Sequence, residues 1–139
     1  MNKNKIEMLG IYYGIWVDCI VRAKSIPKNK ENWAIRCMFF MTFCMAINLV
    51  LLMYISQQYL FGYFFYAITM DFLPKQIDYL LNFVLLFFLP CVVLNYLLIF
   101  RKRRYETLLS KYPYHNGELY LIYSVISIFL PIILMWIFW

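Results

Sequence analysis

The stretch AIRCMFFMTFCMAINLVLLMYIS, residues 34–56, decides the fold of this chain. Its 23 residues contain one charged side chain, Arg36, which stands near the start and can extend to the membrane surface. As an α-helix the run rises about 35 Å, enough to cross a hydrocarbon core about 30 Å thick. Residues 76–99 and 119–139 are two further apolar runs of similar length. The sequence therefore predicts three transmembrane helices.

The composition places the whole chain in a membrane. Of its 139 residues, 65% are hydrophobic and 14% are charged, whereas a soluble domain is about 45–50% apolar and about 25% charged. A soluble core of this length cannot bury so much apolar surface, so lipid must cover the remainder. We expect one domain over residues 1–139, an all-α integral membrane protein.

Residues 6–24 have the pattern of an amphipathic helix. Apolar residues recur at spacings of three and four, namely at Ile6, Leu9, Tyr13, Trp16, Val17, Ile20 and Val21. Asp18 would cost about 2.5–3.5 kcal/mol at the centre of a membrane, and it stands four residues before Arg22, the spacing of an ion pair. We therefore expect an interfacial helix, with Tyr12, Tyr13 and Trp16 at the level of the lipid headgroups.

Residues 57–75 are crowded with aromatic side chains. The segment is interfacial, re-entrant or a short fourth span. Its length and the lack of a polar turn after Ser56 favour an interfacial or re-entrant segment that belongs to an outer aromatic belt. Asp71 and Lys75 are spaced to pair.

The basic residues predict the orientation. Twelve of the 13 Lys and Arg residues lie at or before the start of the first run or in residues 100–117, which we expect to be a basic cytoplasmic loop. Lys75 alone lies between the first two runs. Because basic residues concentrate on the cytoplasmic side, three crossings place both basic regions there, whereas four would separate them. We expect three crossings, a cytoplasmic N-terminus and an outer C-terminus.

A few polar side chains inside the runs are candidates for joining helices. Asn48 and Asn82 both fall in the outer half of the membrane, where they can meet, whereas Asn82 and Asn95 point to nearly opposite sides of one helix. Such residues join helices by hydrogen bonds, or they line a pore once several copies assemble. The candidate pore or helix-interface residues are Asn48, Asn82, Asn95, Ser124 and Ser127.

The densest charge cluster follows the second run. It consists of Arg101, Lys102, Arg103, Arg104 and Lys111. Residues of this kind attract anionic lipid, at about 1 kcal/mol per basic residue near the surface, or they dock an acidic cytoplasmic partner. Basic residues beside spans are ordinary in membrane proteins, so we do not expect nucleic-acid binding from the net charge of +6.

The same sequence argues against pumping and catalysis. No Asp, Glu, Lys or His lies near the centre of any run, although proton-coupled transporters place ionisable groups there. The four cysteines, Cys19, Cys37, Cys44 and Cys91, do not cluster with His115 as zinc ligands would. Catalytic and nucleotide-binding motifs are absent. We expect no enzyme activity, no metal and no cofactor.

The leading hypothesis is a bacterial inner-membrane protein that acts through helix–helix assembly. Its expected form is a homo-oligomeric, channel-like or membrane-perturbing protein, because a single three-span chain is thin for enclosing an aqueous path. The alternative is an accessory or immunity-type subunit, which binds another membrane protein and has no pore of its own. A bacterial source rests on abundant Ile, Lys, Asn, Phe and Tyr, whose codons are AT-rich.

Overall fold

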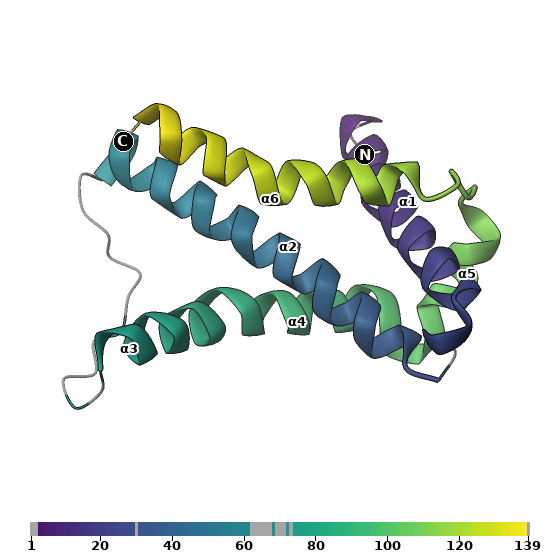
Figure 1. The fold of residues 1–139 in the computed structure, drawn as a ribbon. Coiled ribbons are helices and arrows are strands. Elements are labelled where there is room, and N and C mark those ends of the chain that lie inside the picture. The colour runs from purple at the N-terminus through teal and green to yellow at the C-terminus, as the bar shows by residue number, and fades with distance from the viewer. Residues whose placement is uncertain (1–2, 30, 62–67, 69–71, 73, 139) are drawn as a thin grey trace.

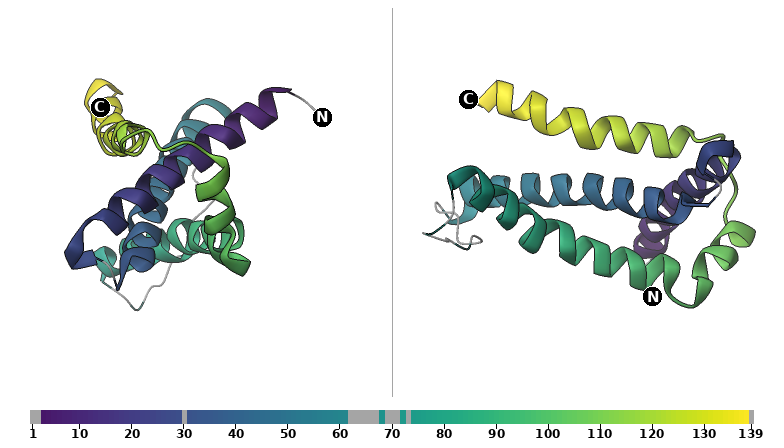
Figure 2. Two further views of the ribbon diagram at one scale, coloured as in Figure 1. Left: turned by 90° about the vertical axis from the view of Figure 1, so that its right-hand side faces the viewer. Right: turned by 60° about the horizontal axis from the view of Figure 1, so that its bottom comes forward.

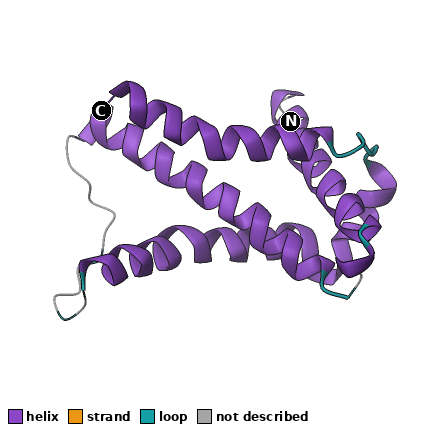
Figure 3. Cartoon of the chain, in the orientation of Figure 1, coloured by secondary structure: helices purple, strands orange, loops and turns teal. Residues whose placement is uncertain are grey.

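The chain is helical along nearly all of its described length. The computed structural model describes residues 3–29, 31–61, 68, 72 and 74–138, and these form helices and connectors without a strand (Figure 3). The α-helices are α1 Lys3–Ser25, α2 Trp33–Ser56, α3 Lys75–Asn82, α4 Leu89–Asn95, α5 Arg104–Lys111 and α6 Glu118–Phe138. The 3-10 helices are η1 Pro27–Asn29 and η5 Arg101–Arg103, and the π-helices are η2 Gln57–Phe61, η3 Phe83–Phe88 and η4 Tyr96–Phe100.

Three helical stretches in the described part of the chain are long and apolar enough to cross a membrane, and they correspond to the three predicted apolar runs. They run Trp33–Leu60 (28 residues), Lys75–Lys111 (37 residues) and Glu118–Ile137 (20 residues). The chain is therefore consistent with a multi-pass membrane protein. Most of the aromatic segment predicted at 57–75, including Asp71 of its expected ion pair, lies outside the described residues.

The three long stretches are arranged with α2 in the middle. The helix that runs from α3 to η4 packs on one side of α2, and α6 packs on the other (Figures 1 and 2). α2 and α6 finish at the same end of the molecule, and α3 begins at that end (Figure 1). We call this the η2 end, made of η2, α3 and the last turns of α6. The opposite end, made of α1, η1, η5 and α5, is the α1 end.

The second long helix changes its hydrogen-bonding pattern on both sides of Pro90. The π-helix η3 leads into α4, and the π-helix η4 follows it. Proline has no N–H to donate and crowds the carbonyl four residues earlier, and a π-helical turn is a common way to accommodate such a break. The change in hydrogen bonding around Pro90 thus takes the form of a locally widened helix.

α1 crosses the three long helices at the α1 end (Figure 2, left view). It packs against α2, α5 and α6, and five consecutive residues, Trp16 to Ile20, are buried. Trp16, which we expected at headgroup level, is fully buried within the protein, and its ring meets Phe100 edge-on at 5.7 Å between centroids. The apolar stripe in the sequence marks only one buried face of α1. A second face of α1 is covered by α6 and by the turn before it.

Residues 100–117, expected to be a loop, include a helix. The chain reverses at Lys102 and Arg103, both in the left-handed region with φ of 55°, and α5 then runs back against α1. The Tyr105 ring of α5 meets the Trp33 ring edge-on, at 5.2 Å between centroids. The Lys24 ammonium lies 4.4 Å from the Trp33 ring centre. These contacts fold the basic segment against the start of α2.

α6 is the most exposed of the long helices. It packs on α2 and α1 along one side and leaves a broad apolar surface on the other. Its exposed large apolar residues are Leu121, Ile122, Val125, Ile126, Phe129, Leu130, Ile132, Ile133, Met135, Trp136 and Ile137. A water-soluble monomer rarely shows an apolar surface of this extent, whereas a lipid-facing helix does.

Candidate functional site

Asn95 lies at the centre of a buried polar cluster that joins α1, α2 and α4. The Tyr12 hydroxyl donates to Asn95 Oδ1 at 2.7 Å, and Asn95 Nδ2 donates to Thr42 Oγ1 at 3.0 Å. Asn95 and Thr42 have no exposed surface. Burial raises the pKa of Tyr12, which keeps its hydroxyl protonated as the donor. Each bond joins a different pair of helices, so the cluster fixes their mutual positions.

Asn48 joins α2 to α6. Its Nδ2 donates to Ser127 Oγ at 2.9 Å and lies 3.4 Å from the Tyr123 hydroxyl, and Ser127 is buried. Pro131, four residues after Ser127, cannot give the Ser127 carbonyl its usual helical donor. A polar contact between helices therefore coincides with a break in the hydrogen bonding of α6.

Asn82 and Ser124 have other partners. Asn82 Oδ1 accepts from the Ile68 N–H, and Asn82 Nδ2 donates to the Ile68 carbonyl, both at 2.7 Å. Asn82 thus binds the backbone of Ile68 and forms no hydrogen bond with Asn48. The Ser124 hydroxyl donates to the Tyr120 carbonyl of its own helix at 2.7 Å, a common local bond. Of the five candidate positions, Asn48, Asn95 and Ser127 join helices within the chain.

Asp18 is fully buried and anchors the start of α6 to α1. Its two carboxylate oxygens accept from the backbone N–H groups of His115 at 2.7 Å and Leu119 at 3.1 Å. Free N–H groups at a helix start favour a negative charge. The expected ion pair with Arg22 is wrong, since no such pair forms in the described part of the chain. The helix terminus supplies the donors instead.

Arg22 lies over the turn before α6. Gly117 in that turn has φ of +80°, and a Cβ built on it would come within 3.0 Å of Arg22 Nη1. Glycine is suited to this position both because of its backbone conformation and because a side chain would displace the guanidinium. The turn therefore helps to position Arg22.

The five basic candidates, Arg101, Lys102, Arg103, Arg104 and Lys111, are all exposed at the α1 end. Arg103 Nη1 lies 3.8 Å from Glu106 Oε1 on an exposed surface, and such pairs add little stability. Two successive left-handed residues with side chains are strained, at about 1–2 kcal/mol each. The chain reverses at these two residues after η4, and the side chains of the basic run are exposed.

The cysteines form no metal site among the described residues. The Cys37 thiol lies 3.5 Å from the Cys19 carbonyl oxygen, to which it donates across the α1–α2 contact. The hydrogen bond with Cys37 and burial raise the pKa of Cys19, so the thiol stays protonated and unreactive. The described residues contain no group of three or more His, Cys, Asp or Glu side chains placed to hold a metal ion.

The sequence did not reveal the partners in these clusters. Tyr12 was assigned to the headgroups and Asp18 to Arg22, because one-dimensional spacing cannot show that α1 crosses the ends of three other helices. Together, the described polar groups can hold helices in register, but they include no arrangement of a nucleophile and a base.

No family model, no curated protein and no solved structure matches this chain.

Proposed function

We propose that this protein is a multi-pass protein of the bacterial inner membrane that serves as an accessory or immunity-type subunit and packs against another membrane protein. One observation carries the proposal. Asn48, Asn95 and Ser127, the polar residues best placed to line a path between copies, are hydrogen-bonded inside one chain. A pore built from several copies would have to break these bonds or use an apolar lining.

The surface offered to the partner is the outward side of α6. Close to it, a cavity of about 650 Å³ lies at the η2 end between α2, α6 and Phe83. Its lining is almost wholly apolar and includes Val50, Leu51, Leu134 and Met135. Without a hydrophobic driving force in lipid, helices associate through close packing. An apolar transmembrane helix with bulky side chains is the partner that such a concave surface fits.

The orientation follows from the position of the charges. The connector between α1 and α2 and the basic run from Arg101 to Arg104 lie at the same end of the long helices (Figure 1). The positive-inside rule then supports a cytoplasmic α1 end and an outer C-terminus. A reporter fused to the C-terminus tests this directly, because cytoplasmic activity of the reporter contradicts the proposed topology.

The partner is tested by site-specific photo-crosslinking in the native membrane. A photoreactive residue at Phe129 on α6 is compared with one at Leu94 on α4, because the two positions are 55% and 48% exposed. We expect a single cross-linked product of defined mass from Phe129 and only lipid adducts from Leu94. The product should be lost when the neighbouring Ile126 becomes Trp, which changes the packing surface without adding charge.

Two outcomes contradict the proposal. Equal cross-linking from both positions means that the contacts are non-specific. A product made only of identical copies, together with ion flux in liposomes from the purified oligomer, supports the channel-like form instead. In that case Asn48→Leu should alter the flux.

A further inference from the structure

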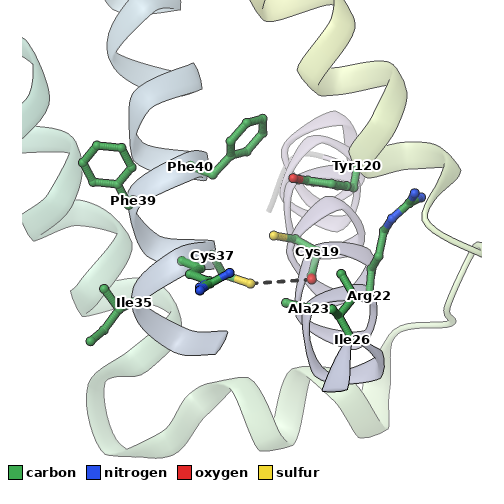
Figure 4. Close-up of a pocket in the computed structure, with 10 residues that line it drawn as sticks. Cys19, Arg22, Ala23, Ile26, Ile35, Cys37, Phe39, Phe40 and Tyr120 are labelled. Atoms are coloured by element: carbon green, nitrogen blue, oxygen red, sulfur yellow. Dashed lines mark hydrogen bonds between the residues drawn. The ribbon is translucent and has the colours of Figure 1, made fainter. Parts of the chain in front are cut away.

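A second cavity lies at the α1 end, between α1, α2 and the first turn of α6. Its volume is about 480 Å³, within the range of about 300–1,000 Å³ found for small-molecule sites. Figure 4 shows its walls. The residues that line it are Cys19, Arg22, Ala23, Ile26, Ile35, Arg36, Cys37, Phe39, Phe40 and Tyr120.

The lining carries positive charge without acidic side chains. Arg22 comes from α1 and Arg36 from α2, and none of the described lining residues is Asp or Glu. The nearest acid in sequence, Asp18, has both oxygens occupied by the N–H groups that start α6. The cavity thus has a net positive potential, which suits an anion.

The rest of the lining suits an apolar chain. Ile35, Phe39 and Phe40 lie on the first turns of α2, and the Phe40 ring packs on Tyr120 at 5.5 Å between centroids. The Tyr120 hydroxyl points from α6 toward the space between α1 and α2 (Figure 4). A cationic rim beside aromatic side chains is the arrangement that an amphipathic anion needs.

The Arg22 side chain is exposed and lies beside the turn that precedes α6. Its side chain lies against Gly117, where any side chain would collide with it, and Figure 4 shows it rising from α1 beside Tyr120. Arg22 and Arg36 come from two helices that border the cavity, whereas Arg101 to Arg104 are not among its lining residues.

We propose that this cavity binds the headgroup of an anionic phospholipid. Arg22 and Arg36 hold its phosphate, the Tyr120 hydroxyl donates to it, and the acyl chains leave along Phe39 and Phe40. The apolar wall and the place of the cavity near the start of a membrane-length helix favour a lipid over a soluble phosphate. The inference does not depend on a protein partner at α6.

The test is a lipid titration of the purified full chain followed by native mass spectrometry. Phosphatidylglycerol is compared with phosphatidylcholine, which has no net charge. We expect phosphatidylglycerol to bind at least tenfold more tightly, and Arg22→Gln or Arg36→Gln each to raise its Kd about tenfold, because one charge-assisted hydrogen bond is lost. Arg101→Gln combined with Arg104→Gln, which removes two exposed charges at the same end, should leave the Kd within about twofold.

A cavity-filling variant separates the site from general charge attraction. Ala23→Leu keeps both arginines and occupies the space, so it should weaken phosphatidylglycerol binding as much as the arginine variants do. Helical content by circular dichroism checks that each variant folds, and Arg36→Gln decides the question if the Arg22 variant does not.

Four results overturn the proposal. The first is equal affinity for the two lipids, and the second is an equal loss in the Arg101 and Arg104 control. The third is full binding by Ala23→Leu, which places the lipid elsewhere. The fourth is displacement of the lipid by glycerol 3-phosphate at equal concentration, which identifies a site for a soluble phosphate.

Discussion

The two ends of this molecule differ in how far the chain's own side chains complete the packing. At the α1 end, side chains from α1, α2 and η4 enclose a core of Trp16, Cys19, Ile20, Cys37, Met41 and Ile99. At the η2 end, α6 exposes most of its apolar side chains, and Trp136 is 89% exposed. The protein's own residues pack the core at the α1 end, whereas the η2 end keeps more of its apolar surface exposed.

The difference has a geometric cause. A helix that crosses the ends of three others contacts all of them, whereas long helices that touch along one side leave their other sides open. The crossing helix also brings polar groups, so the α1 end is fixed by directional bonds through Asp18 and Tyr12. The η2 end contains an apolar cavity of about 650 Å³, larger than the cavity of about 480 Å³ at the α1 end. Stability should therefore be concentrated at the α1 end.

The largest expected contrast compares one substitution at the two ends. Met41 is 1% exposed at the α1 end, and Met135 is 62% exposed near the η2 end. Met41→Ala should lower the free energy of unfolding by about 2–5 kcal/mol, because it leaves a cavity in a closed core, whereas Met135→Ala should change it by less than about 0.5 kcal/mol. Unfolding by sodium dodecyl sulfate in mixed micelles measures both. Similar losses would show that the two ends are equally packed.

A somewhat smaller effect is expected from the buried carboxylate. Asp18→Ala removes both acceptors for the start of α6, and it should cost about 3 kcal/mol because two partly buried N–H groups lose their partners. Asp18→Asn, which keeps one acceptor oxygen, should cost about half of that. The exposed acid Glu106 provides the control, and Glu106→Ala should stay within about 0.5 kcal/mol. An Asp18→Ala chain as stable as the control would mean that water satisfies these N–H groups.

The same contrast shows what the sequence could predict. Three long apolar helices followed from composition and run length, because lipid selects strongly for both. The polar residues Asn48, Asn95 and Ser127 were found because polar groups are rare inside spans. The partners were not found: Tyr12, Trp16 and Asp18 were assigned to an interface because their burial depends on the crossing of α1. The left-handed turn at Lys102 and Arg103 had no signal, since neither residue favours that conformation.

The next prediction concerns the polar bridge from α1 to the spans. Asn95→Leu removes the acceptor for Tyr12 and the donor to Thr42, and it should destabilise the chain by about 1–2 kcal/mol. Ser124→Ala, which removes a bond within one helix, is the matched control and should have almost no effect. If Asn95→Leu is neutral, apolar packing alone joins α1 to the long helices.

The smallest expected effect is the coupling of Asn48 to Ser127, measured by a double-mutant cycle. The single variants Asn48→Ala and Ser127→Ala and their combination should give a coupling energy of about 0.6 kcal/mol, the average for hydrogen bonds between membrane helices. The cycle also bears on function. A chain that keeps this coupling in its native assembly uses Asn48 internally, as the subunit proposal requires. If the coupling vanishes on assembly, the Asn48 amide becomes free to line a lumen. Of the two ends, the α1 end alone would then keep its packing in every state.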